Sequence, residues 1–356
     1  MVNLLRLILM LVVYVVACHA TVNHRCLSGS EMFVCILPSF DYTPGQSIPL
    51  FDLPADVQAI RFIHPFSNTH GSDNNILMYD RILHRQLNSP RAIELSGAYL
   101  TAIEVPSDLE YADFFSNDLK EVHVPANQSY ALRYLDLSLN NRIILPQGLE
   151  NVSRLVNLET LHLSSCSIEV LPPNMFENLN RLAHLTLAGN GLHQIDLNKL
   201  PISLSLLRLD VNAIAKLSLP GNARLPLLED LNLEYNELTE LNVSALVETA
   251  PKLRLFSLGR NLLKRPVLND ILDELNRRNI AYYNMETYDK LCGDHEVYYR
   301  GVCMSEEFFL ISWTDWLGLV LLFVGLVALV GGVAFGGYKL WKRYPNINFG
   351  LRSNSS

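Results

Sequence analysis

The sequence feature that most constrains the fold is the motif LxxLxLxxNxL, which occurs in six copies between Leu132 and Leu263. The residues at its Asn position are Asn140, Cys166, Asn190, Asn212, Asn236 and Asn261. Successive copies are therefore 22 to 26 residues apart, a period at which each copy forms one short structural unit. A single unit cannot bury its own leucines, so neighbouring units must stack and share one core.

Each copy is predicted to contribute one short strand whose leucines point inward, with the strands stacked in parallel. The Asn amide lies where the chain leaves the strand and can pair with backbone groups that would otherwise be buried without a partner. Cys166 replaces one Asn, and we interpret it as a buried structural thiol rather than a redox group. The predicted fold class is α/β, a leucine-rich-repeat solenoid that forms an arc of parallel strands.

Two poorer copies of the motif precede the six regular ones. Ala98 stands at the Asn position of the first, and Asn117 restores the amide in the second. With these two included, residues 91–265 hold about eight repeats. Atypical terminal repeats are expected because the ends of a solenoid must be capped.

Residues 21–90 are predicted to form the N-terminal cap of the array. Cys26 and Cys35 lie close together there and are expected to form a disulfide that seals the first exposed edge. Residues 36–90 look irregular. Within them, Val57, Ile60 and Phe62 indicate a degenerate cap strand.

Residues 266–312 are predicted to form the C-terminal cap. Apolar residues at helical spacing predict one amphipathic helix over 266–278, which would cover the last repeat. Cys292 and Cys303 follow and are expected to form a second disulfide. Metal ligation by these cysteines with His295 is the rival interpretation, but a second pair of close ligands is missing from the sequence.

Two apolar segments at the ends of the chain predict its compartment. Residues 1–20 have the pattern of a secretory signal peptide, whose apolar run is short for a membrane anchor. Residues 313–338 are predicted to form a transmembrane helix, and basic residues follow at once. The prediction is a single-pass type I plasma-membrane protein with an extracellular N-terminus and a cytoplasmic tail at 339–356.

Glycines within the membrane segment suggest that two such helices can approach closely. They form a stripe of Gly318, Gly325, Gly332 and Gly336. Association through this stripe would give a homo- or heterodimer. In the tail, Tyr344 and Ile347 have the spacing of a tyrosine-based sorting signal.

Three Asn-x-Ser sequons lie between the two cysteine pairs. They begin at Asn127, Asn151 and Asn242, and each is predicted to carry a surface glycan. Asn151 and Asn242 follow the strand motif of their repeats. Glycans there would lie on the convex or flanking surface and leave the concave face free.

The sequence favours binding over catalysis. It contains no HExxH, GxSxG, P-loop or CxxC pair, so no enzyme, cofactor or metal is predicted. His162 and His184 fall in different strand columns of adjacent repeats and are not expected to share a metal. The net charge of −8 also argues against a nucleic-acid partner.

The concave strand face is therefore the predicted ligand-binding surface. Stacked strands hold outward side chains on a rigid platform, which lowers the ordering cost of binding a large partner. An acidic cluster is expected at Asp210, Asp230 and Glu234. The predicted face consists of Tyr134, Asp136, His162, Ser164, His184, Thr186, Arg208, Asp210, Asp230, Asn232, Glu234 and Ser257.

The signal peptide, the repeats, the flanking cysteine pairs and the single span together resemble extracellular leucine-rich-repeat receptors. More narrowly, the segment around Cys26 and Cys35, residues 275–282 and the short tail resemble the transmembrane class of insect leucine-rich immune proteins. This resemblance implies innate immune recognition or complex formation with other extracellular proteins. The membrane segment replaces the C-terminal coiled coil of the secreted members, so their disulfide-linked pairing is not carried over.

Two functional hypotheses follow. The first is a recognition receptor or co-receptor that binds a protein or microbial surface ligand and relies on a signalling or adaptor partner in the membrane, since 339–356 is too short for a folded signalling module. The alternative is an adhesion or organising protein without a signalling role. An ectoenzyme is the least supported of the classes considered.

Overall fold

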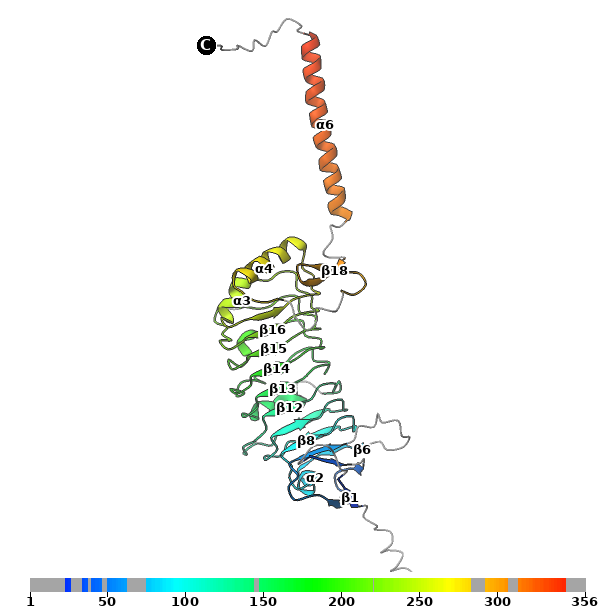
Figure 1. The fold of residues 1–356 in the computed structure, drawn as a ribbon, viewed down its shortest axis with the longest axis vertical. Coiled ribbons are helices and arrows are strands. Elements are labelled where there is room, and N and C mark those ends of the chain that lie inside the picture. Colours follow the sequence, from blue (N-terminus) through cyan, green and yellow to red (C-terminus); the bar gives the residue numbers. More distant parts are fainter. Residues whose placement is uncertain are drawn as a thin grey trace, which may run out of the picture.

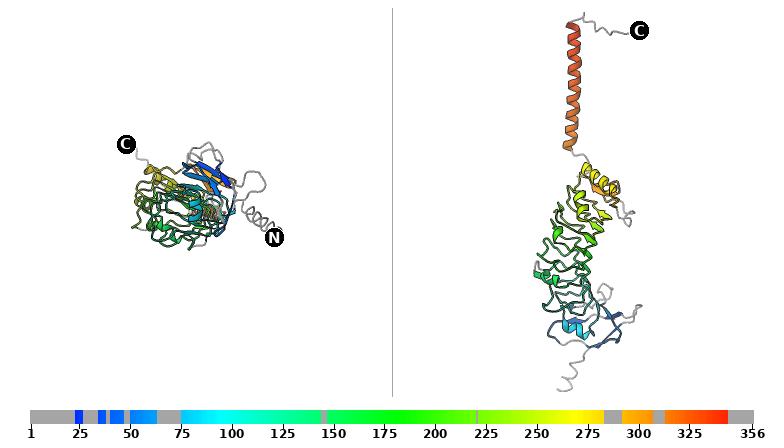
Figure 2. Two further views of the ribbon diagram at one scale, coloured as in Figure 1. Left: turned by 90° about the horizontal axis from the view of Figure 1, so that it is seen from below. Right: turned by 90° about the vertical axis from the view of Figure 1, so that its left-hand side faces the viewer.

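A computed structural model of the chain describes residues 23–26, 34–37, 40–46, 50–62, 75–143, 147–219, 221–282, 292–306 and 313–343. The folded part is an elongated stack of short strands, with α6 beyond its C-terminal end (Figure 1). Two further views show the same stack from below and from the side (Figure 2). The predicted signal peptide at 1–20 and the sorting motif of Tyr344 and Ile347 lie outside the described residues.

The main sheet has ten parallel strands that follow one another along the stack. Its strands are β2 Val34–Leu37, β5 Ala59–Phe62, β8 Ala92–Glu94, β10 Tyr111–Asp113, β12 Tyr134–Asp136, β13 Thr160–His162, β14 His184–Thr186, β15 Leu206–Arg208, β16 Asp230–Asn232 and β17 Leu255–Ser257. The last eight of these correspond to the eight expected repeats. The leucine-rich-repeat solenoid predicted from the motif is thereby confirmed.

The core runs through the middle of every strand. Leu135, Leu161, Leu185, Leu207 and Leu231 are each 0 % exposed, and the parallel register places each of them beside the next. The flanking residue on either side of each middle leucine points away from the core. This period-2 alternation gives the sheet one buried face and one open face.

The Asn side chains form the predicted ladder along one edge of the core. Asn140 is 0 % exposed; its Oδ1 accepts from the backbone N–H of Leu119 at 3.1 Å, and its Nδ2 donates to the carbonyl of Leu137 at 2.9 Å. At the position of the missing Asn, Cys166 is buried and unpaired with another cysteine, and its thiol donates to the same Leu137 carbonyl at 3.2 Å. Burial raises the pKa of Cys166 to about 11, so the thiol stays protonated. The structural interpretation of Cys166 fits this environment.

One residue of each repeat, immediately before the Asn position, has a left-handed backbone. Its φ is 58° at Leu139, 57° at Val211, 52° at Tyr235 and 66° at Gly189. Glycine adopts this conformation without steric cost, whereas a branched side chain such as that of Val211 does not. The repeat geometry therefore imposes the conformation on whatever residue the sequence supplies.

The N-terminal end is more regular than the sequence suggested. Both β2 and β5 join the main sheet, with Cys35 beside Ile60 and Ile36 beside Arg61. Cys35 is 0 % exposed and forms the predicted disulfide with Cys26, so this bond fixes the chain to the core of the first strand. Neither strand has the leucine motif, so the motif does not reveal them.

Smaller elements complete the N-terminal part. Two-stranded parallel sheets pair β1 Asn23–Arg25 with β4 Leu50–Asp52, and β3 Asp41–Tyr42 with β6 Asn75–Ile76. A second parallel sheet comprises β7 Met78–Tyr79, β9 Ala102–Glu104 and β11 Glu121–His123. Helix α2, Arg81–Gln86, lies between β7 and β8 in the chain and is capped by Asp80, whose carboxylate accepts from the N–H groups of residues 82 and 83.

The return path of the repeats changes along the stack. It is a strand in the early repeats, a 3-10 helix in the middle ones, at η1 Gln147–Arg154 and η2 Leu197–Lys199, and an α-helix near the end, at α3 Val243–Thr249. Leucine-rich repeats accommodate this variation because only the strand side is fixed by the motif.

The C-terminal end is covered by a helix and a hairpin. Helix α4, Arg265–Arg277, has Pro at its first turn and buries Leu268, Ile271, Leu272 and Leu275 against the last repeat. The antiparallel hairpin of β18 Glu296–Tyr299 and β19 Val302–Ser305 follows, and Cys292 and Cys303 form the predicted disulfide beside it. Disulfides near both ends of the solenoid thus agree with the predicted fold class.

Helix α6 spans Trp313–Arg343. Within it, Trp316–Lys339 is a stretch of 24 residues, none of it buried, whose length and composition would allow it to cross a membrane. It is the single candidate of this kind among the described residues.

Candidate binding face

The open face of the main sheet carries two columns of outward side chains, one on each side of the buried middle residues. We call this surface the sheet face. The first column contains Tyr111, Tyr134, Thr160, His184, Leu206 and Asp230, and the second contains Arg61, Glu94, Asp113, Asp136, His162, Thr186, Arg208, Asn232 and Ser257. The parallel register keeps neighbours in a column one strand apart, about 4.8 Å. These backbone-fixed columns require little ordering when a partner binds.

Most of the predicted face residues are accessible in part. His184 is exposed, and nine others are of intermediate exposure. Asn232 and Ser257 are only 8 % and 5 % exposed, so they are structural rather than available side chains. The carboxamide of Asn232 accepts from the backbone N–H of Glu234 at 2.9 Å. The hairpin of β18 and β19 covers this end of the sheet. A methyl group added at Gly259, two residues after Ser257, would lie 3.3 Å from the side chain of Val302 in β19.

The predicted acidic cluster lies at the C-terminal end of the sheet face, with Asp230 in the first column and with Asp210 and Glu234 in the turns that follow β15 and β16. Burial raises the pKa values of Asp210 and Asp230, and the positive charge of Arg208 partly opposes both shifts. Burial also raises the pKa of Glu234, while Arg260 acts in the opposite direction. Asp210 Oδ1 is buried and lacks a hydrogen-bond partner within the described part of the chain. The cluster is therefore partly desolvated, and its carboxylates lie close to the guanidinium groups of Arg208 and Arg260.

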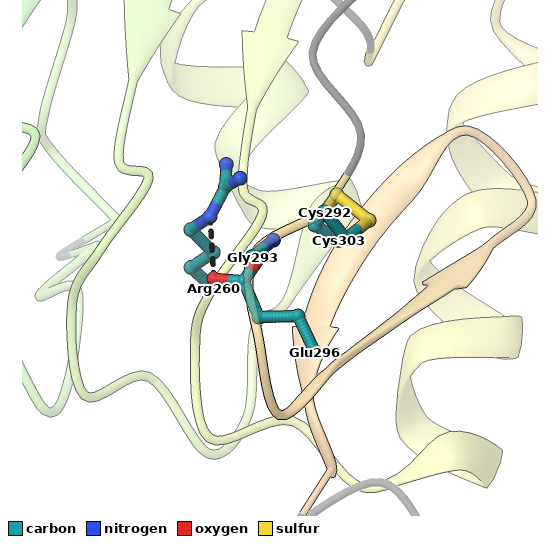
Figure 3. The surroundings of a disulfide bond; sticks show 5 residues. All are labelled: Arg260, Cys292, Gly293, Glu296 and Cys303. Atoms are coloured by element: carbon teal, nitrogen blue, oxygen red, sulfur yellow. Dashed lines mark hydrogen bonds and ion pairs between the residues drawn. A yellow bond between two sulfur atoms is a disulfide. The ribbon is translucent and has the colours of Figure 1, made fainter.

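The C-terminal hairpin contributes to the rim of this cluster. Glu296 of β18 forms an ion pair with Arg260 at 2.7 Å, beside the Cys292–Cys303 disulfide (Figure 3). The guanidinium of Arg260 also lies over the ring of Tyr235, 4.6 Å from its centroid. The sulfurs nearest Glu296 are bonded to each other, so they are not available as metal ligands.

A second cluster lies nearer the N-terminal end of the sheet face. The rings of Tyr111 and Tyr134 are stacked, with centroids 4.2 Å apart and planes inclined by 7°, and His162 adjoins Tyr134 at 5.5 Å. Beside the rings, Glu94, Asp113 and Asp136 occupy adjacent positions of the second column. Burial raises the pKa of Asp113, and the neighbouring carboxylates add to the shift.

The motif predicts Tyr134, Asp136 and His162 as residues of this face, but it does not predict Glu94, Tyr111 or Asp113. These three lie in repeats that match the motif poorly, so the regular copies of the motif do not reveal them. The signal that could have identified two of them is the repeated Tyr-x-Asp pattern of 111–113 and 134–136. The register then aligns the two copies residue by residue.

The two histidines of the sheet face do not converge. His162 lies beside Thr186, and its Nδ1 is 3.0 Å from the threonine hydroxyl. His184 instead lies beside Thr160 in the other column. The two imidazoles are thus separated by the buried middle column, as expected from their positions in the motif.

The sequons lie away from the main sheet. Asn127 is exposed in the loop after β11, and Asn151 is partly exposed within η1. Asn242 is exposed and caps α3, where its Oδ1 accepts from the backbone N–H of Ala245 at 3.0 Å. Glycosylation at these asparagines remains a prediction, as does association through the glycine stripe of α6.

A groove of about 730 Å³ lies between α3 and α4, on elements that do not belong to the main sheet. Asn242 lines it, together with the charged side chains of Lys216, Glu240 and Glu274. A glycan on Asn242 would start in this groove.

Comparisons with known proteins support the fold. No model of a known protein family matches the chain. Tsukushi of Gallus gallus is 31% identical over 155 residues, covering 41% of this chain and 40% of that protein. Lumican of Bos taurus is 34% identical over 143 residues, covering 39% of each. The solved leucine-rich repeat domain of APL1B superposes with a TM-score of 0.51 at 18% identity, over 72% of this chain and 77% of that one.

The chain is a leucine-rich-repeat protein. It spans less than half the length of the curated relatives that it matches. The likeness to the APL1B domain extends over more of the chain and concerns the fold. Two disulfides place the repeats of this leucine-rich-repeat protein in an oxidising compartment, secreted or at the cell surface.

Proposed function

We propose that this protein is a single-pass type I plasma-membrane protein whose leucine-rich repeats bind an extracellular protein or a microbial surface ligand. In this proposal 21–312 lie outside the cell, residues 313–338 of α6 cross the membrane, and 339–356 are cytoplasmic. The candidate span Trp316–Lys339 supports this topology, because its length and composition suit a bilayer. The basic residues Lys342 and Arg343 at the end of α6 support a cytoplasmic position for that end.

The observation that carries the binding function is the charged and partly desolvated sheet face. Asp230 lies on β16, and Asp210 and Glu234 lie two residues after the ends of β15 and β16; all three carboxylates are partly buried, and Arg208 of β15 lies among them. Holding these carboxylates partly buried costs free energy in the isolated protein, because their charged forms lose hydration. The leucine motif does not require charged residues at outward positions, so the fold does not explain why they are there. Complementary charges on a partner would offset that cost and provide specificity.

We assign this binding protein to innate immune recognition, as a receptor or co-receptor acting with a signalling or adaptor partner in the membrane. This assignment rests on the resemblance of the sequence to the transmembrane class of insect leucine-rich immune proteins. Induction of the gene by infection would support it. Constant expression at cell contacts, with aggregation of cells that express the protein, would instead support an adhesion or organising function.

The binding function is tested with the full-length protein in neutral detergent micelles as bait for extracellular proteins and microbial surface material. The face variant carries Arg208→Glu, Asp210→Arg and Glu234→Arg. We expect it to lose at least tenfold in captured ligand, since reversed charges repel the partner that the original charges attract. Capture that is equal for the face variant and the unaltered protein would refute the choice of surface.

A matched control carries Lys252→Glu, Glu177→Arg and Glu248→Arg. These three side chains are exposed away from the main sheet, and the reversals change the net charge by the same amount. Capture by the control should equal that of the unaltered protein. Topology is tested separately with a C-terminal epitope tag on intact cells. The tag should become accessible to antibody only after permeabilisation.

A further inference from the structure

We infer that the N-terminal half of the sheet face is a docking surface for an arginine-bearing basic segment of a partner protein. The surface consists of Tyr111, Tyr134, Asp113 and Asp136, which we call the tyrosine–aspartate patch. The inference deepens the proposed function, on which it rests, because it specifies the chemistry of the partner. It concerns residues of the sheet face that lie apart from the cluster around Asp210.

The aspartates of the patch repel each other, and neither forms an ion pair with an Arg or Lys among the described residues; His162, next in the column, only partly opposes the raised pKa of Asp113. Asp113 and Asp136 are direct neighbours in the second column. Each carboxylate accepts a hydrogen bond from a backbone N–H two residues later, at 2.9 Å and 2.8 Å, and the described residues provide neither with an ion-pair partner. Like charges in directly adjacent positions destabilise a sheet. A bound cation would remove this penalty.

The charge of the patch is confined to the two aspartates. On one side, Glu94 is neutralised by Arg61, which forms a two-pronged ion pair with it. On the other side, the second column continues with His162 and Thr186, which bond to each other. Within the described residues, the negative charge without an Arg or Lys partner thus spans two strands, a width that suits one guanidinium group or two adjacent ones.

The tyrosine rings specify the kind of cation. The stacked rings of Tyr111 and Tyr134 occupy the first column on the same two strands as the aspartates. Both rings are partly exposed on the sheet face. A guanidinium group stacks on an aromatic face and presents a fork of N–H donors that matches a carboxylate. An ammonium group offers the same charge without the planar fork, so arginine should bind more tightly than lysine.

The test measures binding of defined peptides to the full-length protein in neutral detergent micelles. The probes are three fluorescent decapeptides that alternate glycine with arginine, lysine or citrulline, and the readout is fluorescence anisotropy at constant salt. We expect the arginine peptide to bind at least several-fold more tightly than the lysine peptide and more than tenfold more tightly than the neutral citrulline peptide. Equal binding of the arginine and lysine peptides would overturn the assignment to arginine.

The decisive variant carries Asp113→Asn and Asp136→Asn, which remove two charges while keeping side-chain size. It should bind the arginine peptide about tenfold more weakly. A control with Glu177→Gln and Glu248→Gln changes the net charge equally at exposed positions off the sheet and should bind as the unaltered protein does. If both variants lose the same affinity, or neither loses any, the patch is not the site.

Two further measurements separate this inference from folding and from the proposed function. The thermal midpoint of the Asn variant should not fall, because the substitutions remove a repulsion. Tyr134→Leu should reduce the preference for arginine over lysine, a change that lost charge alone would not produce. In one outcome, the face variant with Arg208, Asp210 and Glu234 reversed captures as much ligand as the unaltered protein, while the Asn variant still binds the arginine peptide more weakly. The surface chosen in the proposed function is then wrong, and this inference stands. In the opposite outcome, the face variant loses ligand capture, while the Asn variant binds the arginine peptide as tightly as the unaltered protein. The proposed function then stands, and this inference is wrong.

Discussion

Replacing Asn140 with alanine tests whether the amide ladder stabilises the solenoid in addition to leucine burial. Asn140 is 0 % exposed and lies between two repeats. Its Oδ1 accepts from Leu119 N–H at 3.1 Å, and its Nδ2 donates to the carbonyls of Phe114 at 3.0 Å and Leu137 at 2.9 Å. One side chain therefore connects the backbones of consecutive turns.

The expected loss follows from what each backbone group retains in the alanine variant. The Leu119 N–H loses its side-chain acceptor, and a buried donor without a partner costs about 1–3 kcal/mol. The carbonyls of Phe114 and Leu137 keep second donors, from Asn117 at 3.0 Å and from the Cys166 thiol at 3.2 Å. Each of these two lost bonds then costs roughly 0.5 kcal/mol, at the low end for a hydrogen bond. The free energy of unfolding should fall by about 3 kcal/mol.

The assay is urea denaturation of the full-length protein in micelles, followed by near-ultraviolet circular dichroism of the tyrosines. The control Asn178→Ala removes an exposed amide and should change the unfolding free energy by less than about 0.5 kcal/mol, as surface substitutions usually do. Asn140→Cys should lose less than Asn140→Ala, since Cys166 already fills an equivalent position. A loss below about 1 kcal/mol for the alanine variant would refute the reasoning.

Three further predictions concern single residues. Gly189→Ala should lower the unfolding free energy by about 1–2 kcal/mol in the same assay, because φ is 66° and the added methyl would lie 2.7 Å from the Ser165 hydroxyl. Cys166, with a pKa of about 11, should resist thiol reagents at pH 8 in the native protein and react once the protein is unfolded in urea. Burial lowers the pKa of His84 and Asp108 partly opposes the shift, so the fold favours neutral imidazole; stability should be complete above about pH 6.5 and decrease below it. Thermal midpoints between pH 7.5 and 5 should accordingly decrease more steeply for the unaltered protein than for His84→Gln.

The repeats, the core and the disulfides follow from the sequence because each depends on short-range patterns. Leu161 and Leu185 are buried for the same reason as Leu135, since each lies at the middle of a strand defined by its own motif. The disulfides could be paired because Cys26 and Cys35, like Cys292 and Cys303, are close along the chain. The role of Cys166 followed from its place in the motif. Such features repeat a local rule and need no knowledge of distant residues.

The tertiary structure alone decided which outward residues are accessible and which lie together. Asn232 and Ser257 fit the outward pattern yet are buried, and β5 joins the main sheet without the leucine motif. Tyr111 stacks on Tyr134 because the register aligns two strands that are 23 residues apart. Exposure and contact on the sheet face depend on neighbours from other repeats and from the C-terminal hairpin. A periodic motif specifies its own buried side chains, but it does not specify the residues that adjacent turns bring beside it.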